Sequence, residues 1–171
     1  NIMILQTSDF ESGIFQISQD QNTVVDLQAF ITLDSEKALI YELFGSTLGQ
    51  EFINDLTGDP QTPASTKWTD IFSPFYYDDP CDISITCQGI KEYLKGRIYY
   101  NYVSQQQIIN QASGNVANRS EATSQESLIT KLTVLYNRTI RTGTDLQYYI
   151  YENQATYTDF RGLVLEPISA T

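Results

Sequence analysis

The chain contains no histidine, and this absence removes several kinds of active site. Without an imidazole there is no Ser-His-Asp triad, no Cys-His dyad and no histidine-ligated zinc or haem. Only two cysteines are present, Cys81 and Cys87, too few for a four-cysteine zinc site or an iron–sulfur cluster. We expect them to be reduced thiols, with a small disulfide loop in an oxidising compartment as the alternative.

Positive charge is also scarce in this chain of 171 residues, which has 10 Lys and Arg against 21 Asp and Glu and a net charge of −11. This balance argues against a nucleic acid as an affinity ligand and against docking on an anionic membrane. No apolar run approaches the roughly 18–20 residues of a spanning helix. No basic region followed by an apolar stretch opens the sequence, so we expect no signal peptide.

Apolar periodicity predicts a mainly α fold with two long helices. Ile90, Leu94, Ile98 and Tyr102 recur every four residues and predict a helix over about 88–109. A second period, after a capping box at Thr123–Glu126, predicts a helix over about 123–152. The polar residues between the two, 110–122, are expected to form an exposed loop.

A small β-hairpin is predicted near 75–86. Residues 82–86 alternate in polarity with a period of two, and Asp78-Asp79-Pro80 supplies a turn before them. The rest of 57–81, rich in proline and aromatic residues, is expected to be a packed loop.

The remaining segments complete one expected domain over 1–171. An extended segment covers 1–19, and helical periodicity begins at Gln21, with capping residues at Thr32–Ser35 for a restart. We expect a helix to end at Gly45 and Ser46 to cap the next. The C-terminal tail, 154–171, carries a candidate strand at Leu163–Leu165.

Two residue types are candidates for function. Asp78, Asp79 and Asp82, or Asp9 with Glu11, offer paired carboxylates for a hydrolase or oxygen ligands for calcium, but turn and surface roles explain them better. The chain also has 12 Tyr, and eight of them lie on the two long helices. Tyrosine suits subunit interfaces, which makes an oligomer contact the favoured role for Tyr99, Tyr100, Tyr148 and Tyr149.

Several segments, taken in order, resemble the head–tail connector (neck or adaptor) proteins of tailed bacteriophages, closest to those of crAss-like and other Bacteroides phages. The segments are Phe44–Gly49 (FGSTLG), Gly89–Val103 (GIKEYLKGRIYYNYV), Ser113–Glu121 (SGNVANRSE), Leu135–Arg138 (LYNR) and Tyr148–Asn153 (YYIYEN). The likeness extends from about Thr7 to Gly162 but leaves 57–81 unaligned.

The resemblance implies a small helical bundle with a minor β element. It also implies a structural virion protein without enzymatic activity or cofactor. Copies of such a protein form a ring, usually twelve-fold, that binds the portal protein, meets the tail or further neck proteins, and extends the DNA channel. Its location is the virion neck, assembled in the host cytoplasm with no membrane contact. The loop residues Ser113, Gly114, Asn115, Val116, Asn118 and Arg119 become candidates for contact with the portal or an adjacent subunit, by addition of a strand. Full-strength portal binding after deletion of 113–118 would contradict that role.

The charge fits this interpretation, because acids facing the channel repel DNA and let it slide. Three alternatives stay open: a tail-terminator or other neck ring, an acidic chaperone or binding module that forms a small dimer, and a carboxylate-based hydrolase.

Overall fold

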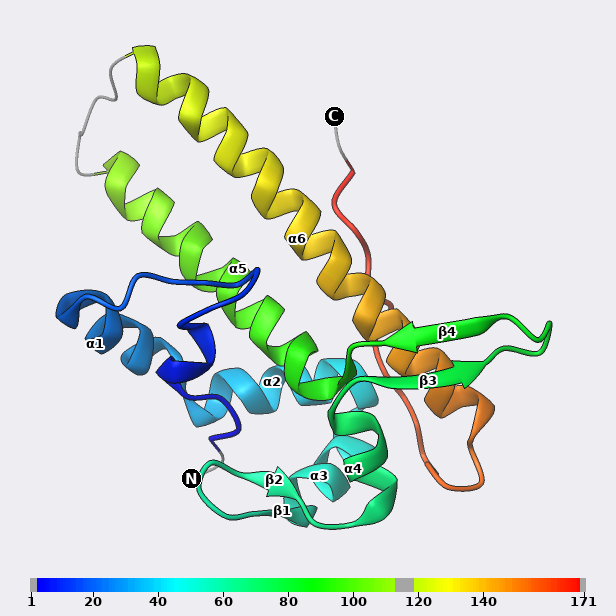
Figure 1. The fold of residues 1–171 in the computed structure, drawn as a ribbon. Helices are drawn as coiled ribbons and strands as arrows, with labels where there is room; N and C mark the ends of the chain where they lie inside the picture. The colour runs from blue at the N-terminus through cyan, green and yellow to red at the C-terminus, as the bar shows by residue number, and fades with distance from the viewer. Residues whose placement is uncertain (1–2, 113–118, 170–171) are drawn as a thin grey trace.

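The structure is a computed structural model that describes residues 3–112 and 119–169, with side chains described except at 33 and 107–128. Its largest feature is an antiparallel pair of helices, α5 (Gly89–Ala112) and α6 (Arg119–Glu152) (Figure 1). These are the two long helices that the sequence predicts, so the mainly α fold class is confirmed.

Of four shorter helices, the first lies beside the C-terminal half of α5 and the other three gather near its N-terminal end (Figure 1). They are α1 (Gln21–Phe30), α2 (Leu33–Phe44), α3 (Ser46–Asp55) and α4 (Thr66–Phe72), preceded by a 3₁₀ turn, η1 (Thr7–Phe10). Two small antiparallel sheets accompany them. Strand β1 (Leu56–Thr57) pairs with β2 (Thr62–Pro63), and β3 (Phe75–Asp78) pairs with β4 (Ser84–Cys87). The second pair is the predicted hairpin, which projects away from the C-terminal half of α6 (Figure 1).

The junction between α2 and α3 depends on Gly45. Its φ of 85° lies in the region that favours glycine, and a Cβ there would approach Arg161 to 2.9 Å. The predicted break is therefore confirmed, but the expected cap is wrong. Gly45 itself caps α3 without a side-chain bond, and Ser46 is the first helical residue. At the start of α2, Thr32 and Ser35 form the expected reciprocal cap.

Three expectations about connecting segments are corrected. Residues 57–81 contain α4 and the β1–β2 pair rather than a loop alone. Helix α6 begins at Arg119, so the capping box at Thr123–Glu126 lies inside the helix, and the expected loop 110–122 is helical at both ends. In the described part of the tail, Leu163–Leu165 forms no strand.

One cluster of buried side chains extends from Ile4 to Leu165. Close contact between α5 and α6 is possible because each presents a glycine to the other. A Cβ on Gly96 would lie 2.1 Å from Thr139 Oγ1, and one on Gly143 would lie 2.6 Å from Tyr93 Cε2. The helix pair is therefore a tightly packed unit that holds the surfaces described next.

Candidate interaction surfaces

The four tyrosines favoured for an interface occupy different environments. Tyr99 is buried and its ring lies 5.5 Å from that of Phe15. Tyr100 is half-buried and packs on Tyr136 of α6 at 4.4 Å. Both belong to the packing of a single chain.

Tyr148 and Tyr149 instead anchor the hairpin. Tyr149 is half-buried with its ring 5.0 Å from Phe75 and 5.3 Å from Tyr77 of β3. Tyr77 also donates a hydrogen bond of 3.2 Å to the backbone carbonyl of Asp145. Tyr148 keeps 36% of its side chain exposed and is the most accessible of the four.

The hairpin exposes two apolar side chains that sequence reasoning did not single out. Tyr76 is 77% exposed and Ile83 is 60% exposed. Strand alternation explains Tyr76, because Phe75 and Tyr77 face α6 and the residue between them faces solvent. The alternation of polarity could have identified it.

The predicted loop candidates Ser113, Gly114, Asn115, Val116 and Asn118 lie outside the described residues. Arg119 is the first residue of α6. Their proposed contact stays a prediction from the sequence.

The aspartates of the hairpin turn serve local structure. Asp79 Oδ1 accepts hydrogen bonds of 2.8 Å from the N–H groups of Cys81 and Ile83. Asp9 is likewise engaged, since it accepts from the N–H of Gln6 and pairs with Lys91 at 2.8 Å. Among the residues whose side chains are described, no group of three or more acids and cysteines is arranged to hold a metal ion.

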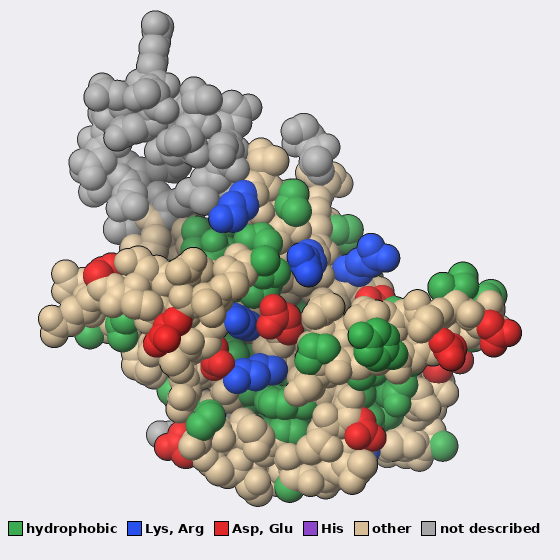
Figure 2. All heavy atoms as spheres, viewed as in Figure 1, with side chains coloured by type: hydrophobic (Ala, Val, Ile, Leu, Met, Phe, Trp, Pro, Cys, Tyr) green, Lys and Arg blue, Asp and Glu red, His purple; other side chains and the backbone are tan. Residues whose placement is uncertain are grey.

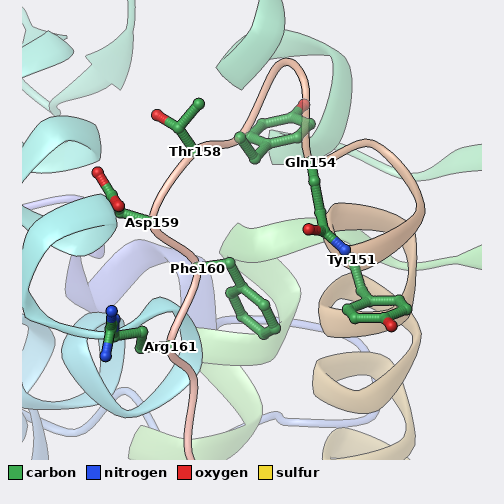
Figure 3. Close-up of a pocket in the computed structure, with 7 residues that line it drawn as sticks. Tyr151, Gln154, Thr158, Asp159, Phe160 and Arg161 are labelled. Atoms are coloured by element: carbon green, nitrogen blue, oxygen red, sulfur yellow. The ribbon is translucent and has the colours of Figure 1, made fainter.

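An open cavity of about 530 Å³ lies where α6 ends and the tail turns back (Figure 3). Its lining includes Tyr151, Tyr157, Asp159 and Arg161. Asp159 and Arg161 lie on the same side of the tail, whereas Tyr151 lies apart from them on α6 (Figure 3). Tyr157 donates its hydroxyl to the carbonyl of Lys67, and burial raises the pKa of that hydroxyl. The cavity therefore brings together one acid and one cation, without a nucleophile paired to a base.

A charged stripe runs along the exposed face of α6. Its members recur at alternating steps of three and four residues, which places them on one face: Lys131, Val134, Arg138, Arg141, Asp145, Tyr148 and Glu152. The first four, here called the basic stripe, are all exposed. Figure 2 shows Lys and Arg side chains gathered on the face that α5 and α6 form.

Two charged residues take part in the core although no sequence pattern singles them out. Glu36 is fully buried near the start of α2, and burial raises the pKa of its carboxyl. Arg97 of α5 reaches Glu42 of α2 through two hydrogen bonds, of 2.8 and 3.2 Å, and also donates to Tyr93 Oη. Glu36 accepts from backbone N–H groups of the N-terminal segment, and Arg97 joins α5 to α2, so both groups serve the packing of the fold.

No helix in the described part of the chain is long and apolar enough to cross a membrane. Comparisons with known protein families, curated proteins and solved structures found no match to this chain.

Proposed function

We propose that the chain is a structural subunit of a phage neck ring, which joins the portal to the tail and extends the DNA channel. The observation that carries the proposal is the ordered set of segments that resemble connector proteins, together with their packing. Phe44–Gly49 spans the α2–α3 junction, Gly89–Val103 forms most of α5, and Tyr148–Asn153 ends α6.

Two of these segments are far apart in sequence but meet in the fold. Tyr100 of Gly89–Val103 packs on Tyr136 of Leu135–Arg138 with ring centres 4.4 Å apart. This contact is expected if the likeness reflects a shared fold. The projecting hairpin and the exposed face of α6 also provide lateral surfaces that a ring subunit requires.

Electron microscopy of the full chain mixed with its cognate portal protein tests the proposal, with native mass spectrometry to count subunits. We expect a ring on the portal whose symmetry matches the portal, usually twelve-fold. A monomer or small dimer that leaves the portal unbound would contradict the proposal and favour an acidic binding module. A ring found on the tail instead would identify a tail-terminator.

In such a ring, DNA is passing cargo and the net charge of −11 disfavours its adhesion. Once microscopy shows which acids face the channel, reversal of their charge is expected to slow DNA ejection. Unchanged ejection kinetics would contradict a repulsive channel.

A further inference from the structure

Three of the ten Lys and Arg residues of this acidic protein lie on one face of α6. Lys131, Arg138 and Arg141 of the basic stripe are exposed and form no ion pair within the part of the chain whose side chains are described. Two acids lie beside the stripe: Asp145, whose carboxyl senses the charge of Arg141, and Glu92, which lines a small crevice with Arg138. Three cations against these two acids leave the stripe positive.

The N-terminal part of the chain has the opposite character. Residues 1–36 contain six acids and no Lys or Arg. Glu36 is buried and Asp9 pairs with Lys91, which leaves four exposed acids: Glu11, Asp20, Asp26 and Asp34. Asp20 and Asp26 belong to α1 and its cap, and the exposed face of this helix also carries Asn22 and Val25.

Helices α1 and α6 pack on different sides of α5, while the segment before α1 reaches the basic stripe, since Ile14 and Phe15 line a small crevice with Arg138. Tyr102 of α5 packs on Phe30 of α1 with ring centres 5.7 Å apart, whereas Tyr100 packs on Tyr136 of α6. Residues two positions apart on a helix point about 200° from each other. Figure 1 shows the same arrangement, with α1 and α6 on either side of α5.

Each surface also has an exposed apolar side chain beside its charges. Val25 on α1 and Val134 on α6 are both 61% exposed. An apolar contact surrounded by opposite charges is the usual composition of a specific interface.

From this complementarity we infer that α1 of one copy docks on the basic stripe of the next copy. Because the contact joins two different surfaces of the chain, it is head-to-tail, and its repetition closes a ring when the rotation per copy allows. This inference rests on the ring proposed above and identifies the two surfaces that join neighbouring subunits.

Charge reversal on each surface tests the contact, with assembly measured by native mass spectrometry with and without the portal. The basic variant is Arg138→Glu/Arg141→Glu, and the acidic variant is Asn22→Lys/Asp26→Lys, which leaves the capping Asp20 intact. Each variant alone is expected to weaken assembly by more than about tenfold, because like charges then face each other. The control Lys37→Glu/Arg161→Glu makes the same charge change as the basic variant elsewhere and should assemble normally.

Mixing the two variants supplies the decisive measurement. Each interface in an alternating ring then joins either two native surfaces or two reversed ones, so assembly should return. Circular dichroism of each variant checks that the helices remain folded, and recovery on mixing excludes misfolding directly. Rings that persist in both single variants would overturn this contact while leaving the neck ring intact.

A pair of introduced cysteines distinguishes a head-to-tail contact from a two-fold contact. In a Cys81→Ser background, Val25→Cys/Val134→Cys should give a ladder of disulfide-linked multimers under mild oxidation. Cross-linking that stops at the dimer would mean a two-fold contact and would overturn both the head-to-tail contact and the ring. Absence of cross-links would overturn the contact.

Loss of binding to a short DNA duplex in Arg138→Glu/Arg141→Glu, with rings intact, would assign the stripe to nucleic acid and overturn the inference.

Discussion

The carboxylate of Glu36 accepts a hydrogen bond of 2.8 Å from the backbone N–H of Leu5. It also accepts from the N–H of Ile4 at 3.0 and 3.1 Å. One buried side chain of α2 thus satisfies two buried backbone donors of the N-terminal segment and fixes that segment on the core.

Replacement of Glu36 should therefore destabilise the fold. In Glu36→Ala both donors lose their partner, and we expect the free energy of unfolding to fall by roughly 3 kcal/mol. Glu36→Gln keeps one carbonyl acceptor and should cost about half as much, whereas Glu11→Gln on the surface should change little. Urea unfolding measures all three. Equal stability of Glu36→Ala and the native chain would contradict the role assigned to this carboxylate.

The pH dependence of the Glu36 contribution has a definite sign. Burial raises the pKa of this carboxyl in the folded state, so the folded chain binds the proton more tightly than the unfolded chain does. The resulting stabilisation is complete below the unfolded pKa of about 4.5 and is lost as pH rises through the raised value. The native chain should therefore gain stability relative to Glu36→Gln as pH falls from 7 toward 4.5. If the native chain instead lost stability relative to Glu36→Gln as pH falls over this range, the raised pKa of Glu36 would be contradicted.

The contact between α5 and α6 predicts a steric effect at Gly96. A new Cβ would meet Thr139 Oγ1 at 2.1 Å, so Gly96→Ala should destabilise the chain by roughly 1–3 kcal/mol. The better helix propensity of alanine, worth up to about 1 kcal/mol, does not offset this clash. Gly96→Ala/Thr139→Ala moves the bulk from one helix to the other and should recover more than half of the loss. Thermal unfolding of both variants checks the pair, and a more stable Gly96→Ala would disprove the tight packing.

The two thiols should differ in reactivity. Cys81 is exposed, whereas Cys87 is buried and its pKa is raised to about 12 by burial. Because the thiolate is the reactive form, iodoacetamide at pH 8 should label Cys81 and leave Cys87 unlabelled until the chain unfolds. Peptide mass spectrometry distinguishes the two sites. Equal labelling rates in the folded chain would show that the β4 end of the hairpin opens.

The long elements were predictable because their patterns repeat. Ile90, Leu94, Ile98 and Tyr102 are all buried, as a period near 3.6 requires. Gly45 was identifiable because few residues other than glycine adopt its backbone angle. Helix α4 was missed because a single helix of seven residues shows too few repeats to establish a period.

The charged core groups were not predictable for a different reason. Glu36 in the first turn of α2 has the same local sequence as any exposed acid that favours a helix N-terminus. Its partners lie 31 and 32 residues away, and only the tertiary fold brings them together. The basic stripe shows the same limit, since its spacing is visible in the sequence but its position relative to α1 is not.

Helix α6 contains 34 residues and is therefore about 51 Å long. Both the hairpin and the C-terminal tail are bonded to this one helix. The hairpin joins it at Asp145, and the tail joins it through Gln147 and through Asn137, whose amide bonds both backbone groups of Ile168. A continuous helix transmits a push along its axis with little bending. A force applied at the hairpin would therefore displace the basic stripe as well, because the hairpin is bonded to the same continuous helix that carries the stripe.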